Sequence, residues 1–214
     1  MNKIKTYIYF SLVAIIFMIL SIWLIKIFNG EMPYVDQWTR SFVHTIAESQ
    51  LYEFAYWVTK LGSQTFLIPF TIVMGIFLWW LYDDWFPSFI FSGGTLMSYL
   101  LNEMIKLIVV RERPSMNVDA HAIGYSFPSG HAMISMVCYG LFIYFLRKKL
   151  SSKKINDILL ICFSSLIFLI GMSRYIINVH YLTDVFSGFT IGFLLFICFI
   201  YLYEWIEEHH RFNT

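Results

Sequence analysis

The chain has 214 residues, of which 58% are hydrophobic, 20% aromatic and only 14% charged. Average soluble domains carry roughly a quarter charged residues, so this chain cannot cover itself with polar surface and lipid is its expected solvent. The formal net charge of +1 excludes a strongly basic nucleic-acid binder and an acidic tail. The length suits one sizeable domain.

Six segments are long and apolar enough, or nearly so, to cross a bilayer, which takes about 20 residues. They are residues 7–28, 65–82, 86–110, 132–146, 158–173 and 182–203. The first is too long for a typical signal peptide core and no small-residue cleavage site follows it, so we expect an uncleaved span. We therefore predict one membrane-embedded domain over residues 1–214, an all-α bundle of six transmembrane helices.

Residues 30–63 lie between the first and second predicted spans and are amphipathic. The stretches VDQWTRSFVHTI and LYEFAYWVTKLG mix aromatic residues with isolated charges at roughly helical spacing. This pattern is typical of helices that lie on a membrane surface. We expect one or two interfacial helices here.

The distribution of basic residues predicts how the bundle is oriented. Lys3 and Lys5 precede the first span, and residues 147–154, RKKLSSKK, place five Lys and Arg in eight positions. Short basic loops stay in the cytoplasm, so we expect a multi-pass protein of the cell membrane with cytoplasmic N- and C-termini. The connections that then face outward are residues 30–63, 111–130 and 174–181.

Polar residues cluster in three places at the outward ends of predicted spans, where lipid should discourage them. These are KLIVVRERP at 106–114, PSGH at 128–131 and SRYIINVHYLTD at 173–184. Ionisable residues at membrane depth are functional candidates. Arg111 and Arg113 also contradict the positive-inside rule, which indicates that the outward connection keeps them for a function.

The three clusters supply the parts of an anion site. Lys106, Arg113 and Arg174 would provide three fixed positive charges, and the forked donors of arginine match phosphate oxygens two at a time. Ser129 and Gly130 lie where the fourth spanning helix should start, after a helix-breaking proline. Amides at a helix N-terminus bind anions, and glycine lets the backbone approach closely.

Two histidines add chemistry to this anion site. His180 and Asp184 are four residues apart, on one face of a helix, where the carboxylate can hold the imidazole in one tautomer. That is the arrangement of an activated histidine nucleophile. His131 is suited to give a proton to a leaving oxygen. The residues describe a phosphoryl-transfer site that needs no metal; a metal-dependent hydrolase with His131, His180 and Asp184 as ligands is an alternative.

These residues resemble a known family. The patterns K-x6-R-P from Lys106, P-S-G-H from Pro128 and S-R-x5-H-x3-D from Ser173 look like the three motifs of the type 2 phosphatidic acid phosphatase superfamily, with all eleven defining positions in order. The resemblance covers residues 100–188. The flanking YVDQWTRSFV and LGSQTFLIPF resemble the amino-terminal half of short bacterial members.

The resemblance implies a role for each motif residue. His180 would attack phosphorus to form a phosphohistidine, Asp184 would orient it, and His131 would protonate the leaving group. The phosphate oxygens would be held by Lys106, Arg113, Ser129, Gly130 and Arg174. Water would then hydrolyse the phosphoenzyme. Members need no metal, and we expect no other cofactor.

Neighbouring residues also have simpler interpretations. Lys106 could be a snorkelling lysine paired with Glu103, although its motif position favours phosphate binding. We assign Asn102 and Glu103 to helix packing or to support of the site. We interpret the polar residues outside the motif positions as a solvated rim or an exposed loop: Arg111, Glu112 and His121.

The expected function is that of an integral-membrane lipid phosphatase whose substrate enters sideways from the outer leaflet. Undecaprenyl pyrophosphate, hydrolysed to undecaprenyl phosphate, is the leading substrate. Among the substrates of the family, it is the one whose diphosphate is released on the outward face of the membrane, where this site is expected. Phosphatidylglycerol phosphate and phosphatidic acid are alternatives, since the motifs read only the phosphate. A non-catalytic phospholipid binder or transporter is an alternative of another class, which would need the cations but neither nucleophile nor acid.

Overall fold

The structure, a computed structural model, describes residues 3–46, 49–114 and 124–211. These residues form helices and no β-strand, as predicted for an all-α chain. The helices are α1 (Lys3–Phe28), α2 (Tyr34–Ile46), α3 (Gln50–Thr59), the 3-10 turn η1 (Lys60–Gly62), α4 (Gln64–Tyr82), α5 (Trp85–Val109), α6 (Gly130–Lys149), α7 (Lys153–Ile176) and α8 (Leu182–Arg211).

Each of the six predicted spans coincides with a long helix. Four of the described helices, α4, α6, α7 and α8, are long and apolar enough to cross a membrane. The count of six spans remains a prediction. The fourth and fifth apolar segments are short for a span, but the helices that contain them are longer, because each helix extends beyond the apolar segment into polar residues. Helix α6 begins at Gly130, and α7 ends at Ile176.

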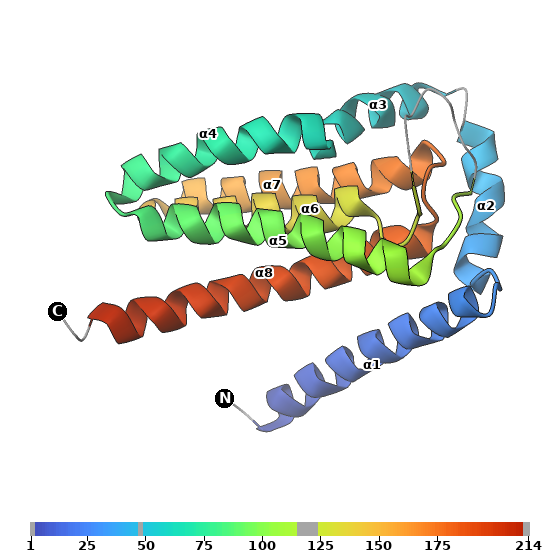
Figure 1. The fold of residues 1–214 in the computed structure, drawn as a ribbon, viewed down its shortest axis with the longest axis horizontal. Helices are drawn as coiled ribbons and strands as arrows, with labels where there is room; N and C mark the ends of the chain where they lie inside the picture. Colours follow the sequence, from blue (N-terminus) through green and yellow to red (C-terminus); the bar gives the residue numbers. More distant parts are fainter. Residues whose placement is uncertain (1–2, 47–48, 115–123, 212–214) are drawn as a thin grey trace.

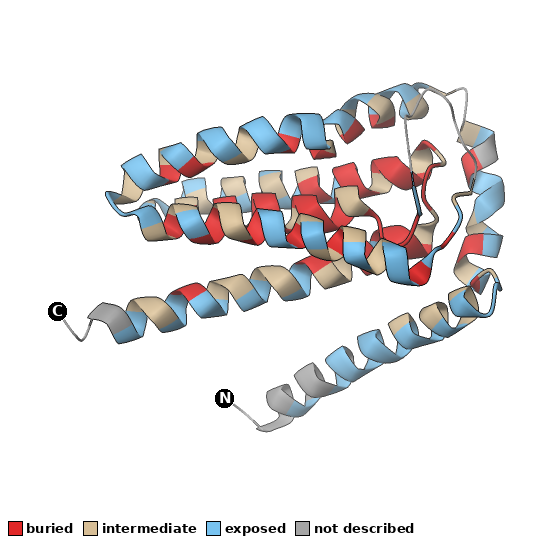
Figure 2. Ribbon diagram, viewed as in Figure 1, coloured by how far each residue is buried: buried red, intermediate tan, exposed pale blue. Residues whose placement is uncertain are grey.

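Helix α6 forms the centre of the bundle (Figure 1) and packs against α4, α5, α7 and α8. About two thirds of its spanning window, 67%, is buried, against 17% for α4 and for α7. Figure 2 shows the same concentration of buried residues around α6 and at the end of the bundle nearest α2. Helix α1 stands apart from the bundle in Figure 1.

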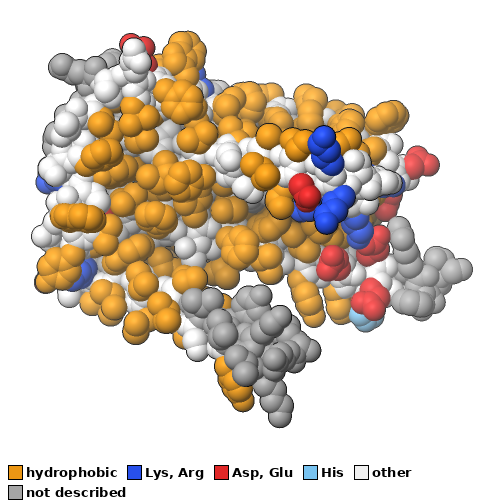
Figure 3. Space-filling model, turned by 180° about the vertical axis from the view of Figure 1, so that it is seen from behind, with side chains coloured by type: hydrophobic (Ala, Val, Ile, Leu, Met, Phe, Trp, Pro, Cys, Tyr) orange, Lys and Arg blue, Asp and Glu red, His pale blue; other side chains and the backbone are white. Residues whose placement is uncertain are grey.

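The outside of the bundle is apolar. Trp80 exposes 75% of its surface and Leu107 72%, and Figure 3 shows hydrophobic side chains spread over the flank with charged ones gathered mainly at one end. Exposed apolar surface on this scale suits contact with lipid chains. The described chain is therefore built as a multi-pass membrane protein.

The loops predicted to lie on opposite sides of the membrane also lie at opposite ends of the bundle. The turns between α4 and α5 and between α6 and α7 lie at the end that holds both termini, and α2 crosses the other end (Figure 1). Residues 30–63 form two helices, α2 and α3, as predicted. Their location on a membrane surface remains a prediction.

Buried tyrosines attach these two short helices to the bundle. The Tyr175 hydroxyl of α7 donates to the Thr39 carbonyl of α2 over 2.7 Å. The Tyr139 hydroxyl of α6 donates to the Leu61 carbonyl of η1 over 2.8 Å. A buried hydroxyl needs such a partner, so both contacts fix the amino-terminal segment against the helices that carry the predicted site.

Candidate active site

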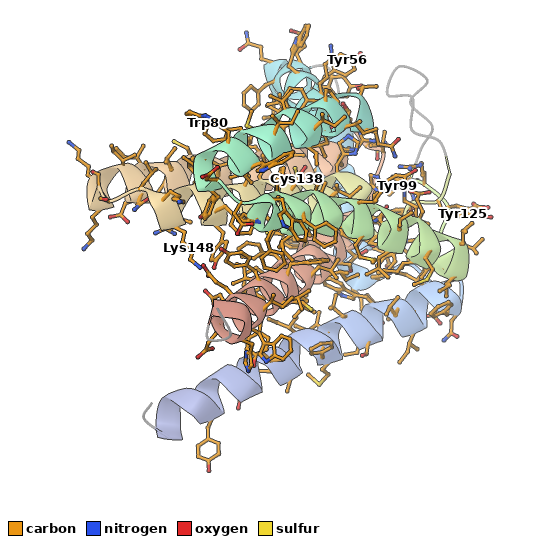
Figure 4. The ribbon with its side chains drawn as sticks, turned by 60° about the vertical axis from the view of Figure 1, so that its left-hand side comes forward. Tyr56, Trp80, Tyr99, Tyr125, Cys138 and Lys148 are labelled. Atoms are coloured by element: carbon orange, nitrogen blue, oxygen red, sulfur yellow. The ribbon has the colours of Figure 1, made fainter. Side chains whose placement is uncertain are left out.

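A cleft of about 1120 Å³ runs between α3, α4, α5 and α6. Six of the eight predicted site residues line it: Lys106, Arg113, Gly130, His131, Arg174 and His180. Its outer part is formed by apolar and aromatic side chains, among them Tyr56 and Tyr99, which Figure 4 labels. A polar end and an apolar wall suit a ligand with a charged headgroup and a hydrocarbon tail.

The remaining two predicted residues, Ser129 and Asp184, are fully buried behind this surface. Ser129 is the N-cap of α6, and its hydroxyl accepts from the Ala132 N–H over 3.5 Å. The Ser129 N–H donates to the Asp184 carbonyl over 3.0 Å. This bond joins the second motif to the third, so the start of α6 and the start of α8 have a fixed relation.

Gly130 opens α6 beside Asn102 of α5. A Cβ added to Gly130 would lie 2.8 Å from the Asn102 Oδ1, which is closer than a real Cβ approaches. The Asn102 Nδ2 donates to the Pro128 carbonyl over 3.3 Å. Asn102 therefore supports the PSGH segment, in agreement with the prediction that it packs or supports the site.

Arg174 presents an unused donor. Arg174 is 5% exposed, and its Nη1 donates to the Thr59 hydroxyl over 3.0 Å. The buried Nε has no hydrogen-bond partner. A buried guanidinium N–H without an acceptor is costly, and a phosphate oxygen in the cleft would satisfy it.

Arg113 is fixed by backbone carbonyls. Nε donates to Gly124 over 2.9 Å, and Nη1 donates to Val179 over 2.8 Å. The same Nη1 lies 3.0 Å from the His180 Nε2. Its charge is thus held directly beside the imidazole.

Lys106 forms an ion pair with Glu103, with 2.7 Å between Nζ and Oε1. The pairing expected for a snorkelling lysine is therefore present, and Lys106 lines the cleft as well. Its side chain is 15% exposed, which leaves the ammonium within the cleft rather than in open solvent. The ion pair with Glu103 and a position in the cleft wall are therefore compatible for Lys106.

The contact with Arg113 decides the tautomer of His180. A guanidinium can only donate hydrogen bonds, so the His180 Nε2 must accept and the proton of a neutral ring must lie on Nδ1. Nδ1 faces the Asp184 Oδ2 at 3.6 Å, within ion-pair distance but longer than a hydrogen bond. The lone pair of Nε2 is therefore directed at the Arg113 guanidinium, in the wall of the cleft.

Residues 87–208 match the sequence model of the PAP2 superfamily, which is more than half of the chain. The chain belongs to the PAP2 superfamily. It is a membrane-embedded phosphatase, a hydrolase of lipid phosphates.

Two relatives and one solved structure are similar to this PAP2 phosphatase. Phosphatidylglycerophosphatase B of Bacillus subtilis (strain 168) is 34% identical over 146 residues, covering 65% of this chain and 68% of the relative. Dolichyldiphosphatase of Saccharomyces cerevisiae is 27% identical over 168 residues, covering 74% and 69%. The crystal structure of a PAP2-type phosphatidylglycerolphosphate phosphatase from Bacillus subtilis superposes with a TM-score of 0.75 at 27% identity, covering 88% of this chain and 96% of that one.

One sequence prediction about the PAP2 site is wrong. Arg111 was expected on a solvated rim, but it is only 9% exposed and forms ion pairs with Asp36 and Asp184. The reason is tertiary: the carboxylates of Asp36 on α2 and Asp184 on α8 lie beside the Arg111 guanidinium and bury it. Arg113 faces the cleft and Arg111 faces away from it. Glu112 is exposed, and His121 lies outside the described residues.

The amino-terminal segment contributes two site residues that sequence analysis missed. Thr59 accepts the hydrogen bond from Arg174, and Gly62 packs so closely on α6 that an added Cβ would lie 3.0 Å from the His131 ring. Both precede the matched region, residues 87–208. Neither belongs to one of the three motifs; Gly62 lies in the flanking LGSQTFLIPF stretch, whose resemblance to the family assigned no role to a single residue.

The electrostatic surroundings of His180 favour its neutral form. Burial first, and then the positive charges of Arg113, Arg174 and Lys106, lower the pKa of His180 well below its ordinary value of 6.5. Asp184 is the negative group that faces it, at 3.6 Å. His180 therefore keeps its Nε2 lone pair at neutral pH.

The pH dependence of kcat/KM reports ionisations of the free enzyme and the free substrate. On its acid side, we expect kcat/KM to fall as His180 becomes protonated, at a pH below 6.5. A depressed pKa keeps the imidazole neutral as the pH falls through 6.5, and activity is lost only as it falls through the lower value. The substrate phosphate also titrates near about pH 6, so Lys106→Gln is the matched comparison. Loss of that positive charge should move the enzyme step upward and leave the substrate step in place. Identical pH profiles for both proteins would contradict this account of His180.

Proposed function

We propose that this PAP2 phosphatase cleaves the terminal phosphate of a lipid phosphate through a phosphohistidine. The observation that carries the proposal is the His180 Nε2, which accepts from Arg113 over 3.0 Å at the wall of a cationic cleft. Nε2 would attack phosphorus, the bond to the lipid oxygen would break, and the phosphoryl group would pass to the imidazole. Lys106, Arg113 and Arg174 would stabilise the charge on the phosphoryl oxygens.

His131 is the acid in this proposal. It lines the same cleft as His180 and is fixed from behind by η1. It would give its proton to the leaving lipid oxygen, and in the second half-reaction it would take a proton from the water that attacks the phosphohistidine. The products are a lipid alcohol or lipid monophosphate and inorganic phosphate, and the enzyme returns to its starting protonation.

Phosphatidylglycerol phosphate is the substrate that we propose. The support is the 34% identity to a Bacillus subtilis phosphatidylglycerophosphatase and the structural match to a phosphatidylglycerolphosphate phosphatase. Undecaprenyl pyrophosphate, which the sequence analysis favoured, is the second candidate. Its support is the 27% identity to a dolichyldiphosphatase, an enzyme named for a polyprenyl diphosphate.

We propose that the site faces outward across the cell membrane. The basic residues Arg147, Lys148 and Lys149 end α6 at the end of the bundle opposite the site, together with the chain termini. The positive-inside rule places that end in the cytoplasm. The cleft then opens at the headgroups of the outer leaflet.

Replacement of His180 by alanine is expected to lower kcat by at least about a thousandfold, because the proposed phosphoryl acceptor is removed. His209→Ala, an exposed histidine at the other end of α8, is the matched control and should retain activity. Phosphate release would be measured in detergent, with and without chelator, and thermal unfolding would confirm that both variants fold. Chelator should change neither rate. Wild-type turnover in His180→Ala would contradict the nucleophile, and loss of wild-type activity with chelator would favour a metal-dependent hydrolase.

A substrate panel separates the candidate lipids. The chemistry at phosphorus is shared, so differences in kcat/KM report binding of the tail and linker. We expect phosphatidylglycerol phosphate to exceed undecaprenyl pyrophosphate and phosphatidic acid by roughly tenfold or more, which one or two good contacts supply. A reversed order would identify undecaprenyl pyrophosphate as the preferred substrate. The absence of phosphate release from any of these lipids would favour a lipid binder or transporter.

Labelling of single cysteines tests the orientation. Tyr125 is 37% exposed near the site, and Lys148 lies at the opposite end of the bundle (Figure 4). In a background with the native cysteines replaced by alanine, Tyr125→Cys should react with an impermeant maleimide on intact cells. Lys148→Cys should react only after permeabilisation. The opposite result would invert the topology and leave the chemistry unchanged.

A further inference from the structure

A buried network of charged residues lies behind the cleft. Arg111 Nη2 donates to the Asp36 Oδ2 over 2.7 Å, and Nη1 donates to the Asp184 Oδ1 over 2.5 Å. Both carboxylate side chains are 0% exposed and the Arg111 side chain is 8% exposed. Arg111 also lies over the Tyr181 ring, with 4.0 Å from Cζ to the centroid. One guanidinium therefore joins α2 to α8.

None of these three charged residues lines the cleft. Arg111 has both ends of its fork occupied by carboxylates, so it cannot also bind a phosphate in the cleft. Burying charged groups is costly unless each one is paired. A network that is fully paired and turned away from the substrate is suited to fixing the geometry of a neighbour.

That neighbour is the Asp184 carboxylate. Its Oδ1 is held by Arg111, and its Oδ2 accepts from the Tyr181 N–H over 2.9 Å. With both oxygens held, the carboxylate keeps Oδ2 directed toward the His180 Nδ1 at 3.6 Å. Rotation of the carboxylate would move its negative charge away from Nδ1, the ring nitrogen that carries the proton when Nε2 accepts from Arg113.

Asp36 fixes the other end of Arg111. Its Oδ1 accepts from the Thr183 N–H over 3.0 Å, and its Oδ2 accepts from the Thr183 hydroxyl over 2.6 Å. The Thr183 hydroxyl in turn accepts from Arg111 Nη1 over 2.8 Å. Asp36 lies on α2, outside the matched region of residues 87–208. Besides Thr59 and Gly62, the amino-terminal segment thus reaches the site through Asp36.

We propose that Arg111 and Asp36 are positioning residues, which hold Asp184 and through it His180 in the geometry for phosphoryl transfer. The inference rests on the proposed phosphohistidine function. It assigns α2 a role in the rate of the reaction and none in binding the phosphate. Loss of the network should therefore lower kcat and leave KM nearly unchanged.

Thr183 offers the mildest test, because Thr183→Val and Thr183→Ser are a matched pair. Valine keeps the shape and removes the hydroxyl that both Arg111 and Asp36 use; serine keeps the hydroxyl. We expect Thr183→Val to lower kcat by roughly tenfold or more, the effect of two lost buried hydrogen bonds, with KM within about twofold. Thr183→Ser should recover most of kcat. Equal kcat values for the two variants would overturn the proposal.

A double-mutant cycle separates positioning from packing. Arg111→Met and Asp36→Asn should each lower kcat by about a hundredfold or more in the wild type, as loss of a charged partner does. In an Asp184→Asn background, the same changes should cost less than about threefold, because the residue they act through is already altered. Equal losses in both backgrounds would show a structural role and overturn the proposal. If Arg111→Met does not fold, the Thr183 variants and Asp36→Asn still distinguish a positioning role from a packing role.

The same measurements distinguish this inference from the proposed function. A wild-type protein without turnover on any lipid phosphate would overturn the function itself. A wild type with turnover, together with Thr183→Val and Asp36→Asn variants that keep its kcat, would overturn only the positioning role.

Discussion

Positive charge from three segments converges on one small volume at the end of an apolar bundle. Lys106 comes from α5, Arg113 from the following loop and Arg174 from the last turn of α7. Like charges held close together in a poorly hydrated site repel one another. The fold offsets this repulsion with backbone carbonyls around Arg113, Glu103 beside Lys106 and Thr59 at Arg174. The buried Nε of Arg174 has no hydrogen-bond partner, and an anionic ligand would complete the arrangement.

The same charges set the chemistry of the histidine. Positive surroundings and burial keep His180 neutral, and a donor-only guanidinium beside Nε2 places the proton of the neutral ring on Nδ1. An incoming phosphate dianion would take over donors of Arg113 and bring phosphorus toward Nε2. Binding and activation of the nucleophile therefore depend on the same side chains, and one cleft can serve both.

The sequence predicted the all-helical fold and the start of α6 well, because hydropathy and turn chemistry are local. Ser129 caps α6 where a proline and a glycine indicated a helix start. The sequence predicted Arg111 wrongly, because only tertiary structure brings its partners Asp36 and Asp184 beside it. The pair between Arg111 and Asp36 joins residues 75 positions apart. No periodicity in a single chain indicates such a contact, and the same holds for Thr59 and Gly62.

Identification of the phosphorylated residue in a single turnover tests the central claim most directly. Excess enzyme would be mixed with a radiolabelled lipid phosphate, quenched in alkali, which preserves phosphohistidine, and mapped by peptide mass spectrometry. The account predicts a transient phosphoryl group on His180 whose formation and decay keep pace with turnover. A phosphoryl group on His131, or turnover without any phosphorylated residue, would contradict it.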